Sequence, residues 1–269
     1  VTDPTTTPRT SARTWRARAA EAAVADLDRA DDASAFEAAR RVVDRGLFGA
    51  LTAFAGLAAL GLIAGWTTTA ELLRPSDVPV HAPAMLFVLV ATPWLLLLLR
   101  AVILVALRRR AMPVLGRAVP TGFLHAIGRW RPADADPSIV AASATRVGDV
   151  LANGSGRRVA AAGTGVFWSM FALAAVATLW LTTARVALGF GWESSWLSPR
   201  VGQAITDLAA APLAPLIGPD ELQPVAAPPT AAADDDAALA VRRRWIRFLT
   251  AGVVFYLLAP MALWTVANA

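Results

Sequence analysis

The chain has 269 residues, 56% of them hydrophobic, and a formal net charge of +5 in which every basic residue is arginine. This apolar share exceeds the roughly 45–50% of an ordinary soluble domain. Cysteine is absent, which excludes disulfides, thiolate nucleophiles and sulfur-ligated metals. No basic patch is interleaved with aromatic residues, so the sequence gives no indication of a nucleic-acid partner.

Residues 1–46 are predicted to form a cytoplasmic N-terminal arm ahead of the first apolar run. The arm begins with a Thr- and Pro-rich stretch typical of disorder and continues as a predicted helix over residues 12–45. The part from 34 to 45 is amphipathic and mixes arginine with acidic residues. Gly46 is expected to separate this helical arm from the first span.

Four long apolar runs follow, and each approaches the length that crosses a bilayer. A helix rises about 1.5 Å per residue and needs roughly 20 residues to cross about 30 Å of hydrocarbon. We therefore predict an all-α membrane protein with about four transmembrane helices in contact with the lipid bilayer, two within residues 47–107 and two within 159–269. The runs are Leu47–Trp66, Met85–Leu99, Val159–Ala184 and Trp245–Ala269, the last broken only by Arg247.

Arginine is concentrated in the connection at 108–158, which carries nine Arg against three Asp. Such an excess beside transmembrane ends marks the cytoplasmic side. The two chain ends are therefore predicted to be cytoplasmic as well, and the loop 185–241 to be external. Residues 138–152 of the Arg-rich connection predict a second amphipathic helix, whose apolar face needs a partner or a lipid surface.

A short helix is predicted at 199–211 in the external loop. A Ser-Pro pair is a typical helix start, and Val201, Ile205 and Leu208 are spaced for one apolar face. We expect this helix to lie along the outer membrane interface.

An alternative topology has residues 201–217 crossing the membrane. That crossing would move Arg242 to Arg244 from the outer to the inner side. Asp207 and prolines interrupt a stretch already short for a span, so we favour four spans with the arginine triplet outside.

Two sequence blocks resemble a known family. Residues 189–198 read Gly-Phe-Gly-Trp-Glu-Ser-Ser-Trp-Leu-Ser after the third span, and Trp245–Leu249 forms a Trp-x-x-Phe-Leu start of the last span. With them the chain resembles an uncharacterised bacterial inner-membrane family, a domain of unknown function with a Phe-Gly-Trp-Glu block. Members are often encoded beside a GTPase-domain protein, so the resemblance implies a cytoplasmic GTPase partner and no activity. Met261 departs from the pattern, because members carry Arg and a basic tail after the proline of this span.

The candidate functional residues of the first block are Trp192, Glu193 and Trp196, with Arg185 about two helical turns earlier. In one interpretation Glu193 pairs with Arg185 in an outer polar site that binds a ligand or gates a path. In the other, which we favour, Trp192 and Trp196 anchor the chain at headgroup depth and Glu193 caps a turn or the following helix.

Three further arginines are candidates. Arg100 interrupts a run of leucines, and it marks a functional site if it faces other helices. We favour instead that it snorkels to the inner interface near Arg108. Arg157 and Arg158 follow an Asn-Gly-Ser-Gly stretch and could bind an anion or a lipid headgroup, although a flexible turn with positive-inside arginines also explains them.

The sequence identifies no catalytic, cofactor-binding or metal-binding residue. His81 and His125 fall on opposite sides of the membrane in this topology, and the predicted spans hold no carboxylate or histidine for a proton relay. We therefore expect a non-enzymatic integral membrane anchor or scaffold that recruits a cytoplasmic partner. The alternative is a homo-oligomeric channel or small transporter, with Arg100 and a kinked second span lining its path.

Overall fold

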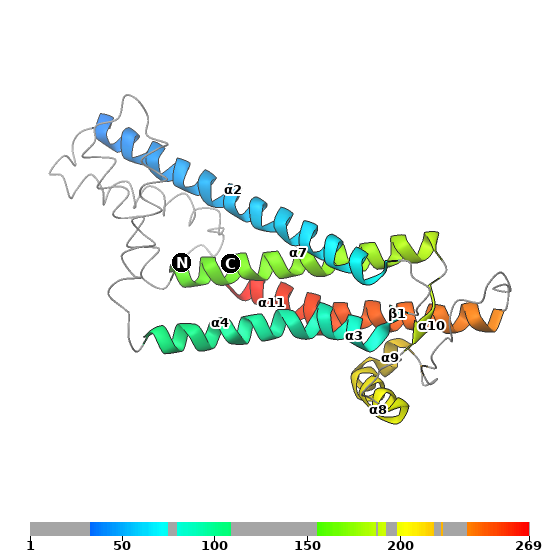
Figure 1. Cartoon of the computed structure of the whole chain (residues 1–269). Coiled ribbons are helices and arrows are strands. Elements are labelled where there is room, and N and C mark those ends of the chain that lie inside the picture. Colours follow the sequence, from blue (N-terminus) through cyan, green and yellow to red (C-terminus); the bar gives the residue numbers. More distant parts are fainter. Residues whose placement is uncertain are drawn as a thin grey trace, which may run out of the picture. The chain divides into compact units, whose positions relative to one another are not determined.

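The computed structural model describes residues 33–74, 80–108, 155–186, 188–191, 198–217, 222 and 236–268. The chain forms two compact units, Val1–Ala55 with Val105–Ala160 and Gly56–Leu104 with Ala161–Ala269. We call the second the bundle unit, and the packing described below lies within it (Figure 1).

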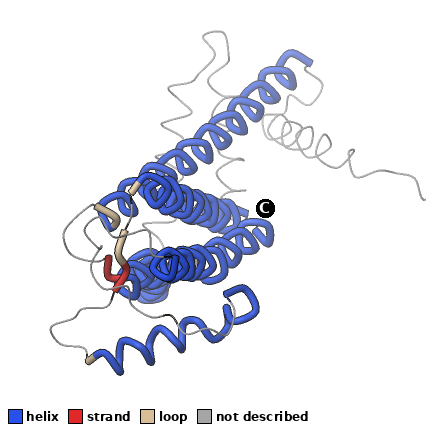
Figure 2. The backbone as a smooth tube through the Cα atoms, turned by 90° about the vertical axis from the view of Figure 1, so that its right-hand side faces the viewer, coloured by secondary structure: helices blue, strands red, loops and turns tan. Residues whose placement is uncertain are grey.

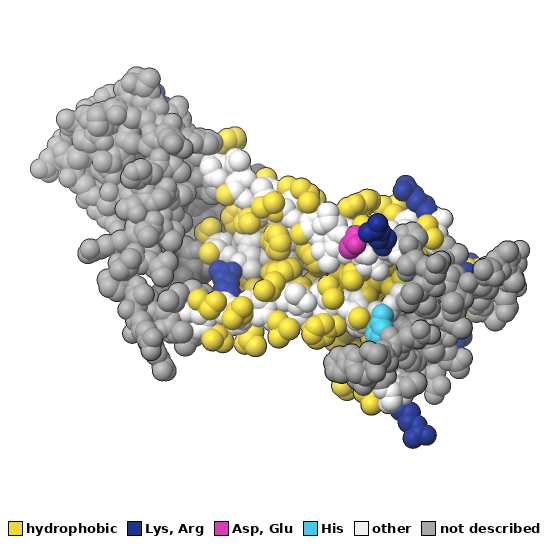
Figure 3. Space-filling view, in the orientation of Figure 1, with side chains coloured by type: hydrophobic (Ala, Val, Ile, Leu, Met, Phe, Trp, Pro, Cys, Tyr) yellow, Lys and Arg dark blue, Asp and Glu magenta, His cyan; other side chains and the backbone are white. Residues whose placement is uncertain are grey.

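Within the residues that the structure describes, four helices are long and apolar enough to cross a membrane, which confirms the predicted all-α class. Each carries large apolar side chains on its exposed surface, and Figure 3 shows such side chains spread over one face of the molecule. Lipid covers an exposed apolar band of this kind, so the chain is a multi-pass membrane protein. The spans are Leu51–Leu72, Ala82–Ile103, Arg158–Arg185 and Leu239–Asn268.

The first span is part of one long helix, α2 (Ala33–Leu72), and the expected break at Gly46 is wrong. A single glycine costs a helix only about 1 kcal/mol relative to alanine, which a long apolar helix tolerates. α2 also continues past Trp66, where Thr67 donates its hydroxyl to the Ile63 carbonyl at 2.9 Å. The helix therefore ends beyond the apolar run Leu47–Trp66 from which the first span was predicted.

α2 runs parallel to α7 (Ser155–Arg185), and the two helices meet through glycines. Gly61 lies against the carbonyl of Phe167, and Gly65, one turn later, lies against that of Phe171. A Cβ on either glycine would collide with these backbone atoms. This glycine seam lets two backbones approach closely, as is usual where lipid removes the hydrophobic drive for helices to associate.

The last span runs antiparallel to α7. Trp180 donates its indole N–H to Thr250 Oγ1 at 3.1 Å, whereas Gly165, earlier in α7, lies against Thr265, later in the last span. The last span is built from α10 (Asp236–Val253), a π-helical turn (Val254–Leu258) and α11 (Ala259–Asn268).

The second span runs parallel to the last one. Leu86 packs on Gly252, and further along both helices Trp94 donates its indole N–H to the Tyr256 carbonyl at 2.8 Å. The four spans therefore alternate in direction, as successive crossings of one membrane must, and the colours of Figure 1 follow the chain through them. Figure 2 shows the same helices as tubes in a view turned by 90°. The second span is built from α3 (Ala82–Leu86), a π-helical turn (Phe87–Ala91) and α4 (Thr92–Arg108).

One end of the bundle unit is closed by a buried cluster that we call the end cap. There β1 (Val80–His81) pairs in parallel with β2 (Phe190–Gly191), and both strands are only two residues long. Phe190 stacks on Trp245, with the ring centroids 6.3 Å apart and the planes at 21°. The end cap consists of Leu73, Met85, Leu188, Phe190, Leu213, Trp245 and Phe248.

The predicted helix at 199–211 is present as α8 (Pro199–Ala210), which continues through a 3₁₀ turn into α9 (Ala214–Ile217). No helix long and apolar enough to span a membrane is found in this described segment. Val201, Ile205 and Leu208 remain exposed on α8, and they form the face predicted to meet the membrane interface.

The two halves of the bundle unit repeat one pattern. Trp66 begins a Trp-Thr-Thr-Thr-Ala stretch near the end of α2, and Trp180 begins Trp-Leu-Thr-Thr-Ala near the end of α7. Each helix leads to a short strand, and the following span carries a π turn just before a proline, Pro93 or Pro260. Matching spans run parallel, as in membrane proteins with internal parallel repeats.

Candidate functional site

Arg100 lies within the second span and reaches the neighbouring helix α7. Its Nη1 donates to Thr164 Oγ1 at 2.5 Å, while the side chain as a whole is exposed. Thr164 is about 9 Å along α7 from Arg158, where the third span begins. The guanidinium thus donates to a neighbouring helix, as expected of an arginine that faces other helices. It also lies near the end of the span, as expected of an arginine that snorkels to the interface.

The Trp-Glu block lies only partly within the described residues. Arg185 ends α7 and is exposed. Trp192, Glu193 and Trp196 lie outside the described residues, so the pairing of Arg185 with Glu193 stays a prediction.

The two blocks that carry the family resemblance meet in the end cap. Phe190 belongs to the first block and Trp245 to the second, and their rings stack while both side chains are fully buried. Trp245 also makes an edge contact with Phe248, with the centroids 5.7 Å apart. These aromatic residues therefore hold the fold together at one end of the bundle unit.

Arg157 and Arg158 lie in the first turn of α7, which begins at Ser155. The flexible turn expected before the third span therefore does not extend beyond Gly154. A glycine at 156 is tolerated there, since the first N–H groups of a helix have no partner within it. Arg158 is exposed, and the side chain of Arg157 lies outside the described residues.

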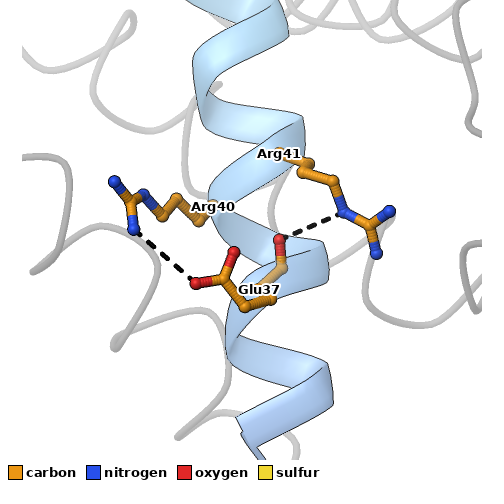
Figure 4. A network of polar contacts seen from close by, with 3 residues as sticks. All are labelled: Glu37, Arg40 and Arg41. Atoms are coloured by element: carbon orange, nitrogen blue, oxygen red, sulfur yellow. Dashed lines mark hydrogen bonds and ion pairs between the residues drawn. The ribbon is translucent and has the colours of Figure 1, made fainter.

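The early part of α2 presents a small polar network (Figure 4). Arg40 forms an ion pair with Glu37 at 3.6 Å, and Arg41 Nε donates to the Glu37 carbonyl at 3.4 Å. All three side chains are exposed. Exposed pairs of this kind contribute only a few tenths of a kcal/mol, so their main effect is to present charge on a regular helix.

A chain of hydrogen bonds that the sequence analysis missed joins the second span, the last span and α8. Pro260 has no N–H, so the Tyr256 carbonyl four residues earlier loses its usual helical donor. Trp94 Nε1 supplies a donor to this carbonyl at 2.8 Å, and the Tyr256 hydroxyl donates to the Ala209 carbonyl at 2.8 Å. A proline within an apolar span indicates in the sequence that a carbonyl one turn earlier lacks its helical donor. The sequence does not show that Trp94 lies close enough to supply one.

Arg242 is the second feature that the sequence analysis missed. Its side chain is only 7% exposed, whereas that of Arg243 is exposed. Helical spacing places Arg242 on the same face as Trp245 and Leu249, both fully buried. Its Nε and Nη2 are buried and have no hydrogen-bond partner in the described part of the chain. The sequence shows the arginine triplet, but it does not show which of the three side chains is buried.

A family model described as "Protein of unknown function (DUF2868)" matches residues 106–268. The match takes in the last two spans and both blocks on which the resemblance rests. No curated protein and no solved structure matches the chain. The chain therefore belongs to this family of proteins of unknown function, DUF2868, as the resemblance implied.

Proposed function

We propose that the protein is a non-enzymatic anchor or scaffold that recruits a cytoplasmic partner to the bacterial inner membrane. The observation that carries this proposal is the length of α2, which has 40 residues. At about 1.5 Å per residue the helix extends over about 60 Å, roughly twice the hydrocarbon thickness. Residues 33–50 precede the span and continue it as a charged helix, a regular surface on which a partner can dock.

Hydroxyl groups within the spans support a scaffold over a transporter. The hydroxyls of Thr178, Thr183 and Thr265 each donate to a carbonyl one turn earlier in their own helix, at 2.8 Å. Hydroxyls satisfied in this way offer few free groups to replace the hydration shell of an ion. Among the described span residues the buried hydroxyls of Thr69 and Ser169 do lack a hydrogen-bond partner, so the polar lining that a single chain could offer is small.

The partner class rests on the family resemblance and on charge. The resemblance implies a GTPase-domain protein, and the nine arginines of the 108–158 connection favour a cytoplasmic location for that connection and for the arm. We expect both segments to contribute contacts to the partner.

The test is copurification of the full chain in mild detergent, with quantitative mass spectrometry of what stays bound. The diagnostic variant exchanges two charges of the arm, Glu37→Arg with Arg40→Glu, which keeps the ion pair and the net charge. The matched control exchanges two exposed charges of α8, Arg200→Glu with Asp207→Arg. We expect a cytosolic protein at fixed stoichiometry with the wild type and the control, and at least a tenfold loss with the arm variant.

Two results would count against this proposal. If no cytosolic protein stays bound to the wild type at fixed stoichiometry, the scaffold function is wrong. If the arm variant retains the partner as well as the control does, α2 is not the docking surface.

The proposed topology has its own test, because the chain has no cysteine. Single variants Glu37→Cys and Arg200→Cys place a thiol at an exposed position before the first span and on α8. We expect an impermeant maleimide to label Arg200→Cys in intact cells and Glu37→Cys only after the inner membrane is opened. Labelling of both from outside would reject a cytoplasmic arm.

A channel or small transporter remains the second candidate, and Arg100 is the observation that favours it. An exposed guanidinium within a span could face a second copy of the chain in an oligomer. This function predicts that Arg100→Leu changes ion conductance in reconstituted vesicles without lowering expression. Unchanged conductance would leave the scaffold as the better proposal.

A further inference from the structure

Arg242 is a buried cation, and no anion balances it within the described part of the bundle unit. The two acidic side chains described there are engaged elsewhere: Glu71 pairs with Arg74 at 3.5 Å, and Asp207 accepts from Gln203 at 2.6 Å. A guanidinium keeps its positive charge, and a buried charge without a counter-ion is strongly destabilising. A counter-anion at this position would therefore stabilise the fold.

The depth of Arg242 in the membrane indicates what kind of anion can reach it. Residues 248–268 carry no charged side chain, and they extend over about 30 Å, the thickness of the hydrocarbon core. Arg242 lies about 9 Å before this stretch, at the depth of lipid headgroups. Trp245 lies between them, at the level where membrane proteins concentrate tryptophan.

The surrounding charge favours an anion with more than one negative charge. Arg243 and Arg247 lie on the same helix and are exposed, so the local potential is positive. The donor fork of arginine matches phosphate oxygens and can bind two of them at once.

We propose that Arg242 anchors a buried site for a phosphate group at headgroup depth. The phosphate comes from a phospholipid headgroup or from free inorganic phosphate, and both present the same oxyanion to the guanidinium. This site is independent of the scaffold function, because it lies in the bundle unit and not in the arm.

The test uses the full chain, purified in mild detergent and stripped of lipid by extended washing. Thermal stability is measured while inorganic phosphate or an anionic phospholipid in detergent micelles is added, and bound phosphorus is assayed before and after stripping. We expect the apparent affinity for the phosphate-bearing ligand to fall about tenfold or more in Arg242→Met, because hydrogen bonds to a charged group are lost. The matched control, Arg243→Met, removes the same charge from an exposed position of the same helix, and it should weaken binding far less than Arg242→Met because Arg243 contributes only to the local potential and donates no hydrogen bond to the site.

The two sources of phosphate give different results. Stabilisation by the phospholipid alone, with phosphorus that leaves only on stripping, identifies a lipid site. Stabilisation by inorganic phosphate alone identifies a free-anion site. If Arg242→Met does not fold, Arg242→Lys keeps the charge but loses the fork, and it should bind more weakly than the wild type.

Three results would overturn the proposal. One is a wild-type protein that holds no phosphorus and is stabilised by neither ligand. Another is an equal response of Arg242→Met and Arg243→Met to both ligands. The third is a Glu193→Gln variant that is destabilised as much as Arg242→Met, with no further effect when the two are combined, because the counter-ion would then be a carboxylate of the chain itself.

Discussion

The first span and the other three are held in the bundle unit by different forces. Residues 56–72 of α2 meet α7 at Gly61 and Gly65, and the side-chain hydrogen bonds described in this part of α2 stay within the helix. The other three spans are joined by directed hydrogen bonds from Arg100, Trp94 and Trp180 to neighbouring helices. The buried share is lowest in the first span, at 11%, but it is only 17% in the second, against 33% in the last and 44% in the third.

The first span therefore depends on close packing, whereas the other three add hydrogen bonds between helices to close contacts at Gly165 and Gly252. If either glycine of the seam gains a side chain that collides with the backbone of α7, the two helices can no longer approach closely at either position. A hydrogen bond in a membrane bundle contributes about 0.6 kcal/mol on average, so the loss of one leaves the others in place.

The largest expected effect is that of Gly65→Leu, which should break the seam between α2 and α7. The new Cβ meets the backbone carbonyl of Phe171, which cannot move aside as a side chain can. We expect a loss of about 3 kcal/mol or more in the free energy of unfolding, measured by denaturant titration in detergent. Gly56→Leu on the same helix is the matched control, because a Cβ there has open space around it. Equal destabilisation by the two variants would show that the seam is not what holds α2.

A smaller effect is expected from Trp94→Phe, which removes the donor to the Tyr256 carbonyl. Without Trp94 this carbonyl loses the donor that compensates for Pro260, and we expect a cost of about 1 kcal/mol in the same titration. Trp264→Phe serves as control, since Trp264 is 53% exposed. A variant as stable as the control would mean that another donor replaces the indole.

Tyr256→Phe should loosen α8 while leaving the spans packed. It removes the hydroxyl that donates to the Ala209 carbonyl, a bond worth about 1 kcal/mol. We expect hydrogen exchange of the α8 amides to accelerate about fivefold, with little change in α7. Uniform acceleration across the bundle unit would instead indicate that this bond stabilises the whole unit.

The smallest effect is expected from Thr164→Val, which removes the acceptor of Arg100. The guanidinium is exposed and can turn towards headgroups, so the cost in unfolding free energy should be about 0.5 kcal/mol. Thr52→Val is the control, because the Thr52 hydroxyl donates to the Phe48 carbonyl of its own helix. A cost well above 1 kcal/mol would show that Arg100 depends on protein contacts and would favour the channel.

The number and approximate positions of the spans could be predicted from the sequence, whereas helix ends and inward-facing polar groups could not. The break expected at Gly46 failed because the local preference of one glycine is weak against a continuous apolar helix. Arg242 and Arg243 are adjacent and identical, yet only the first is buried. The sequence pattern predicted that the triplet lies near one end of a span. It did not predict how the helix is rotated about its axis, which decides which arginine is buried.

The sequence by itself determined an all-α membrane protein with four spans, and residues 106–268 placed the chain in its family. The spans could be predicted because only the length of each apolar run has to be compared with the thickness of a bilayer, and this length is read directly from the sequence. Only the tertiary structure decided that Gly61 and Gly65 form a seam, that Trp94 supplies the donor missing at Pro260 and that Arg242 is buried. These features depend on the rotation and depth of one helix against another, which packing fixes and a single apolar run does not encode.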